Sequence, residues 1–88
     1  MAILAQASDT RVRSVDIDDV RLTVELMDGR SISVPLAWYP RLLDATPEQR
    51  QRYEVAGGGY GLHWPGLDED LSTEGLLRGA PAPSWRAR

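Results

Sequence analysis

One histidine and three consecutive acids form the part of the chain best suited to chemistry. His63 is the only histidine, and Asp68, Glu69 and Asp70 follow it after a Pro-Gly pair. An imidazole ordinarily titrates near pH 6.5, and a neighbouring carboxylate can orient its ring. These residue types could therefore supply a general acid–base pair or part of a metal site.

Spacing and composition weigh against both kinds of chemistry at this stretch. The chain has no cysteine and no second histidine, and the histidine spacings of zinc enzymes are missing. On a strand, His63 would face away from Leu62 and Trp64, and so away from a core that they build. We therefore expect no catalytic residue, no metal and no cofactor. We keep His63 with the acids Asp68, Glu69 and Asp70 as candidates for binding another protein.

The glycine-rich run Gly57–Gly61 (GGGYG) has the composition of a phosphate-cradling loop. A P-loop, however, ends in Gly-Lys-Ser/Thr at the start of a helix, and this chain has no lysine. A dinucleotide fingerprint requires a parallel βαβ unit. We interpret the glycines as the end of one helix and the tight start of a strand.

The segment Trp38–Arg41 (WYPR) is the second candidate surface. Trp, Tyr and Arg are the residue types enriched at the hot spots of protein interfaces. Because the chain has no Phe, Trp38 and Trp64 are also the natural bulk of its core. We expect one tryptophan ring inside, with Tyr39 and Arg41 outside as binding candidates.

The elements that would position these residues begin with strands. Arg11–Ile17 is typical of a strand, and Val20–Met27 alternates apolar and polar side chains with the period of a half-buried strand. Asp28-Gly29 predicts a two-residue type I′ turn, after which Ser31–Val34 alternates again. Pro35 ends that strand because it cannot donate to a ladder. The pattern predicts a three-stranded antiparallel meander.

Short helices follow the strands. Thr46, Pro47 and Gln49 form a capping-box signature, which predicts a helix over about 46–55. A single helical turn is expected near 73–77. One or two short strands are expected at 60–64 and 71–72.

Taken together, these elements predict the α+β class. We expect one domain over residues 11–79, a flexible arm over 1–10 and a flexible tail over 80–88.

Composition sets the class of protein. The chain has 88 residues, 42% hydrophobic and 26% charged, which fits one small folded domain. The net charge of −3 gives no overall attraction to nucleic acid. No stretch resembles a signal peptide or a membrane span, and disulfide staples are impossible without cysteine. We therefore expect a cytoplasmic protein without a membrane partner.

Two motifs carry a family resemblance: PLAWYPRL at Pro35–Leu42, and GLHWP followed by DED at Gly61–Asp70. With these motifs, the chain from Val12 to Gly79 resembles the bacterial family named domain of unknown function 2442. The resemblance implies a small α+β domain built on an antiparallel sheet and brings no activity or catalytic residue. It also implies a gene beside that of another small protein, and some members of the family precede a DNA-binding helical domain.

Two classes of function remain open, and an enzyme ranks behind both. The first, which we favour, is a non-enzymatic protein-interaction module that binds another small, basic protein encoded nearby, as in a toxin–antitoxin-like pair. The acidic balance fits a basic partner, and strand edges fit β-augmentation.

The alternative is a nucleic-acid-associated transcriptional regulator or accessory protein. It is favoured by Arg78, Arg86 and Arg88 with Trp85 near an acid-free end of the chain. Three arginines are few beside the roughly 6–10 phosphate contacts of a well-bound protein. The oligomeric state stays open.

Overall fold

The computed structural model describes residues 8–82 and contains two three-stranded sheets. The first sheet has the order β1 (Val12–Ile17), β2 (Arg21–Leu26), β3 (Ser31–Pro35), and the second has the order β4 (Glu54–Ala56), β5 (Gly61–Trp64), β6 (Glu69–Ser72). All pairings are antiparallel. The helical segments are η2 (Leu36–Trp38), α1 (Pro40–Leu43), α2 (Pro47–Arg50), η3 (Gly57–Gly59) and α3 (Thr73–Arg78). The predicted α+β class is confirmed.

The predicted meander forms the first sheet. Leu22, Val24 and Leu26 are fully buried on one face of β2, while the residues between them stay more exposed. Val24 pairs with Ile32 across to β3, so the apolar positions of both strands lie on the same face. The period-2 pattern in the sequence therefore correctly predicted both the strands and the face that they bury.

The turn between β2 and β3 differs from the predicted type I′ turn. Only Gly29 has a positive φ, at 96°, whereas Asp28 does not. The Gly29 N–H donates to the Leu26 carbonyl at 3.0 Å, and the Leu26 N–H donates to the Arg30 carbonyl at 2.8 Å. The loop therefore has three residues, a type I turn closed by one glycine. This geometry leaves the Asp28 carboxylate free to accept from Arg30 at 2.8 Å.

The helix predicted over 46–55 begins as expected but ends early. Thr46 Oγ1 accepts from the Gln49 N–H at 3.1 Å, and Gln49 Oε1 accepts from the Thr46 N–H at 2.8 Å, which completes the capping box. The helix stops at Arg50, and Glu54–Ala56 pairs with β5 as a strand. The predicted end was wrong because a mostly polar segment has little apolar surface to bury as a helix, whereas as a strand it satisfies one edge of β5.

The glycines 57–59 consequently have a different role from the one predicted. They form η3, the loop between β4 and β5, and all three have positive φ. A chain reversal in so few residues requires the left-handed conformations that glycine adopts without strain. The predicted strand at 60–64 and the predicted turn of helix near 73–77 appear as β5 and α3, and Leu71-Ser72 lies in β6.

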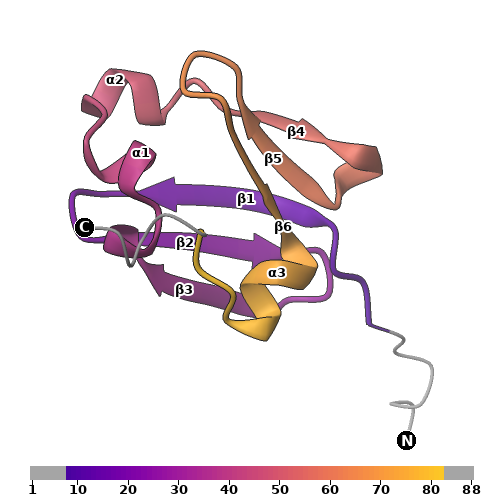
Figure 1. The fold of residues 1–88 in the computed structure, drawn as a ribbon. Helices are drawn as coiled ribbons and strands as arrows, with labels where there is room; N and C mark the ends of the chain where they lie inside the picture. The colour runs from indigo at the N-terminus through magenta and orange to yellow at the C-terminus, as the bar shows by residue number, and fades with distance from the viewer. Residues whose placement is uncertain (1–7, 83–88) are drawn as a thin grey trace, which may run out of the picture.

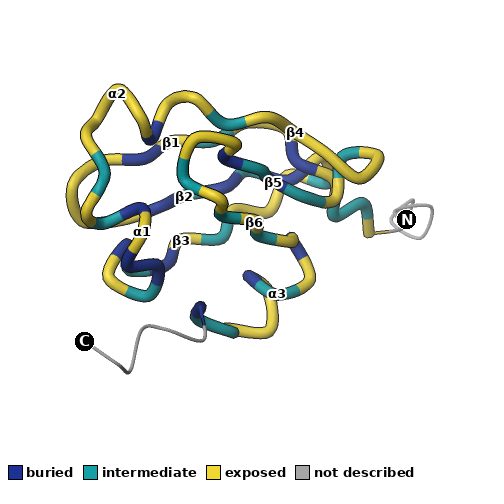
Figure 2. Tube along the Cα trace, turned by 45° about the horizontal axis from the view of Figure 1, so that its top comes forward, coloured by how far each residue is buried: buried dark blue, intermediate teal, exposed yellow. Residues whose placement is uncertain are grey.

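The core lies between the first sheet and the later elements. In Figure 1, β6 passes across one face of the first sheet, and α3 lies against β3. Figure 2 shows buried residues along β1, β2, β5 and α1. Trp64 is fully buried there, and its indole N–H donates to the Arg50 carbonyl at 2.8 Å. No helix within residues 8–82 is long and apolar enough to cross a bilayer.

Packing extends beyond the expected bounds 11–79 at both ends. The Asp9 N–H donates to Asp28 at 3.0 Å, and the Ala82 N–H donates to the Trp38 carbonyl at 3.1 Å. Ala82 is also buried. Residues 1–7 and 83–88, most of the expected arm and tail, lie outside the described residues.

Candidate functional site

Arg41 joins the two candidate segments into one surface. It lies on α1, and its Nη1 donates to the backbone carbonyl of Asp68, in the turn between β5 and β6. The Asp68 carboxylate oxygen Oδ2 lies 3.8 Å from the same nitrogen. Asp68 holds a positive φ of 52°, the one non-glycine case among residues 8–82. Aspartate tolerates this conformation better than most residues. The Trp38–Arg41 and Gly61–Asp70 stretches are therefore neighbours in space.

His63 and Asp70 form a cross-strand pair beside this contact. They are register partners on β5 and β6, and His63 Nδ1 lies 2.5 Å from Asp70 Oδ1 in a shared hydrogen bond. Leu62 and Trp64 face the core on either side, so His63 points outward as predicted. The carboxylate orients the imidazole, but within the described chain no three His, Asp or Glu side chains gather around a possible metal position.

Tyr39 lies inside, which corrects the expectation that it is exposed. Only 1% of the residue is accessible, whereas its neighbour Trp38 is only partly buried. The reason is the chain reversal: Tyr39 sits between η2 and α1, and the bend turns its ring toward the sheet. Burial, with a smaller effect from the charge of Glu69, raises the pKa of Tyr39 to about 12.

The three consecutive acids do not act as one charged patch. Asp68 is 95% exposed in the turn and lies near Arg41, and Asp70 is 72% exposed and pairs with His63. Glu69 instead shares the partly buried face of β6 with Leu71. Burial raises the pKa of Glu69, and the positive charge of Arg41 opposes that shift. The alternation of Glu69 with Leu71 was the sequence signal for this inward position.

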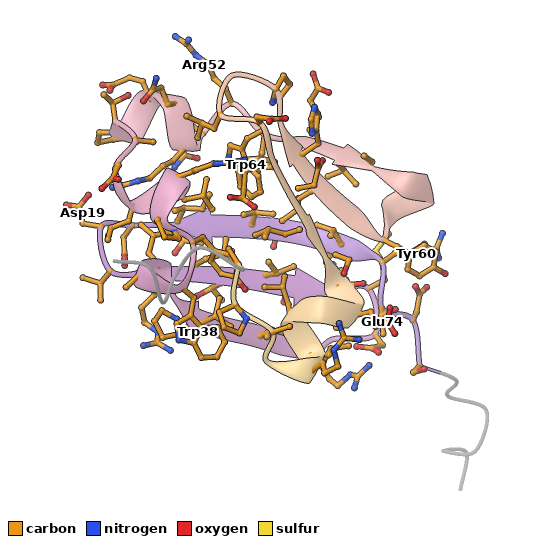
Figure 3. All side chains as sticks on the ribbon, viewed as in Figure 1. Asp19, Trp38, Arg52, Tyr60, Trp64 and Glu74 are labelled. Atoms are coloured by element: carbon orange, nitrogen blue, oxygen red, sulfur yellow. The ribbon has the colours of Figure 1, made fainter. Side chains whose placement is uncertain are left out.

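Behind these residues lies a cavity of about 160 Å³ that the sequence did not reveal. Tyr39, Glu69 and Leu76 line it together with the segment 80–82. A second hollow of about 270 Å³ lies between α2 and the turn after β5, with Arg52, Glu54 and Leu67 among its walls. Both are smaller than the ~300 Å³ at which small-molecule sites begin. Figure 3 shows Arg52 projecting outward while Trp64 points inward.

The basic residues that favour a nucleic-acid-associated function do not form a common surface within residues 8–82. Arg78 lies 3.6 Å from Glu74, one helical turn earlier on α3. Trp85, Arg86 and Arg88 lie outside the described residues. The described surface therefore adds no observation in favour of that alternative.

The model of a protein family described as "Protein of unknown function (DUF2442)" matches residues 12–82. The chain belongs to the DUF2442 family. The resemblance seen in the sequence motifs is thus confirmed, and both motifs lie inside the matched range. No curated protein matches the chain.

Two solved structures resemble this DUF2442 chain. One is the crystal structure of a protein of unknown function from Rhodospirillum rubrum, which is 33% identical in sequence, with a TM-score of 0.72. The match covers 89% of this chain and 98% of the Rhodospirillum rubrum chain. The other is the solution structure of an uncharacterized protein from Chromobacterium violaceum, which is 29% identical in sequence, with a TM-score of 0.70. The match covers 88% of this chain and 73% of the Chromobacterium violaceum chain. These two proteins therefore share the overall fold of this chain.

Proposed function

We propose that this protein is a non-enzymatic interaction module whose role is to bind another small protein. The binding surface is the paired face, defined here as Arg41, His63, Asp68 and Asp70. The observation that carries the proposal is the contact between Arg41 and Asp68, because it joins segments 27 residues apart into one exposed surface. Pro40 and Pro65 stiffen the two segments, which lowers the ordering cost of association.

The partner is basic in this proposal. Asp68 and Asp70 are mostly exposed, and the whole chain carries a net charge of −3. Rim charges of this kind accelerate encounter with an oppositely charged protein more than they tighten the final complex. The family resemblance implies a partner encoded nearby, and in this proposal the two proteins form a toxin–antitoxin-like pair. The absence of cysteine fits a cytoplasmic pair.

Surface-plasmon kinetics test this proposal once the chain, used as bait in its native host, has captured a partner. The double variant Asp68→Asn/Asp70→Asn removes the two exposed charges of the paired face. We expect its association rate to fall about threefold or more at low salt, with a flatter salt dependence. Arg41→Ala should mainly accelerate dissociation, because it loosens the contact between the two segments.

The matched control is Asp16→Asn/Glu48→Gln, which removes the same charge from exposed positions on β1 and α2. Electrostatic steering by net charge alone would slow association equally in both double variants. Equal rates and equal salt dependence for the two variants would therefore exclude the paired face as the interface.

A further inference from the structure

The cavity behind the paired face lies along the unpaired edge of the second sheet. Its order, β4-β5-β6, leaves one side of β6 without a strand partner. On that side the cavity of about 160 Å³ separates β6 from the segment 80–82, with Leu71, Leu76 and Ala82 among its apolar walls. Its volume suits one long side chain and is well below the ~300 Å³ of small-molecule sites.

A buried tyrosine lines this cavity. Tyr39 lines the cavity and is 99% buried as a residue, since only 1% of it is accessible, and its hydroxyl makes no hydrogen bond within residues 8–82. No fully buried side-chain nitrogen or oxygen of those residues lacks a partner. The hydroxyl oxygen of Tyr39 is therefore not completely sealed from solvent, and Tyr39 is one of the residues that line the cavity. It is available to accept or donate one hydrogen bond there.

Glu69 supplies the charge of the cavity wall. Its carboxylate makes no ion pair among the described residues, because the nearby Arg41 is engaged with Asp68. The described residues offer this carboxylate no side-chain hydrogen-bond donor, and the backbone of Asp70 only partly offsets the rise in its pKa that burial causes. A half-buried carboxylate with so little support favours a cationic neighbour.

We propose that this cavity accepts one lysine side chain of the partner protein. The aliphatic stem lies against Leu76 and Ala82, and the ammonium group donates to the Glu69 carboxylate and the Tyr39 hydroxyl. Lysine fits this role because it combines a long apolar stem with a compact cation. An arginine fork needs more room and coplanar acceptors, and among residues 8–82 no three acidic or histidine side chains gather to hold a metal ion. This inference rests on the proposed function and specifies the chemistry of its partner.

A titration of the full chain with n-butylammonium, followed by NMR, tests the cavity without the partner. We expect saturable shifts of the Glu69–Ser72 and Ala80–Ala82 amides. Glu69→Gln should weaken binding about tenfold or more, because a charged hydrogen bond is lost. Tyr39→Phe removes only the hydroxyl, keeps the buried ring, and should weaken binding about two- to tenfold. Asp16→Asn, an exposed position on β1 that does not line the cavity, is the matched control and should bind n-butylammonium like the unchanged chain.

Three outcomes would overturn the inference. One is equal binding of the neutral n-butanol, which would make the cavity merely apolar. Another is unchanged affinity in Glu69→Gln, with the spectrum elsewhere intact. The third is a set of shifts centred on His63 and Asp68, which would place the cation on the paired face.

The two proposals fail separately. If n-butylammonium does not bind while a captured partner still associates through Asp68 and Asp70, the lysine cavity is excluded and the interaction face stands. If n-butylammonium binds in the cavity but the charge variants leave association unchanged, the paired face is excluded instead.

Discussion

The Arg50 guanidinium reaches Asp19, 31 residues earlier in the chain, with 2.8 Å between Nη1 and Oδ1. The same side chain donates from Nε to the Leu42 carbonyl at 2.8 Å and from Nη2 to the Leu43 carbonyl at 3.0 Å. Arg50 thereby fixes the C-terminal end of α1 against the turn between β1 and β2. Because α1 carries Arg41, this buried arginine also positions the paired face.

The two ends of this contact should differ greatly in their effect on stability. The Arg50 side chain is 7% exposed, so Arg50→Met leaves two carbonyls at the end of α1 short of a donor, and we expect a loss of about 2–4 kcal/mol. Asp19 is 84% exposed, so water and the remaining amide of Asp19→Asn can replace the carboxylate, and the loss should stay below about 1 kcal/mol. Urea unfolding followed by tryptophan fluorescence measures both. A loss in Asp19→Asn as large as that in Arg50→Met would mean that the ion pair, not the carbonyl contacts, holds α1.

The hairpin turn gives a prediction about backbone strain alone. Gly29 has a φ of 96°, and a Cβ there would meet no atom within 4 Å. Gly29→Val therefore creates no clash, and its cost is that of forcing a β-branched residue to positive φ, about 1–3 kcal/mol. Gly66→Ala is the matched control, because Gly66 also has open space but lacks a positive φ. We expect its denaturant midpoint to move little, within about 0.5 kcal/mol. Equal midpoints for Gly29→Val and the unchanged chain would contradict the assigned turn.

The parts of the fold that the sequence predicts well are those set by local patterns. The alternation of Leu22, Val24 and Leu26 identified the central strand, and the Thr46–Gln49 capping box marked the start of α2. The sequence did not predict β4 because all of its residues are exposed. Without a buried face, its sequence has no alternation of apolar and polar residues to recognise. Its pairing with β5 is a tertiary interaction that overrides the local preference.

In the candidate site, too, local patterns predicted some features, whereas others depend on contacts between distant segments. The outward direction of His63 followed from the strand period, whereas the burial of Tyr39 depends on how the chain bends between η2 and α1. The bond from the Trp64 indole to the Arg50 carbonyl joins residues 14 apart and has no local signature. The cavity beside Glu69 exists only because the segment 80–82 returns to Trp38. These features arise from packing between distant segments, which no pattern of spacing records.

The raised pKa of Glu69 predicts how stability depends on pH. Burial is the main cause, and Asp68 and Asp70 add to the rise while Arg41 opposes it; Tyr39 faces the carboxylate as a neutral phenol. Between the ordinary glutamate value of 4.5 and the raised folded value, the folded chain binds more protons than the unfolded chain. The contribution of Glu69 to the free energy of unfolding therefore falls as pH rises through that window, and the penalty stays constant above it.

Glu69→Gln removes this penalty while keeping the size of the side chain. We expect the variant to be more stable than the unchanged chain at pH 7, with a difference that shrinks on acidification and vanishes below about pH 4, where the carboxyl is protonated in both states. Urea midpoints across this pH range measure the difference, with the exposed Asp16→Asn as the control that removes one charge elsewhere. A Glu69→Gln chain that is less stable by the same amount at every pH would show that the carboxyl group is a structural hydrogen-bond partner. If Glu69→Gln is instead more stable only near neutral pH, the ionised carboxylate lowers the stability of the unchanged chain. This is expected for a group whose function is to bind a cation.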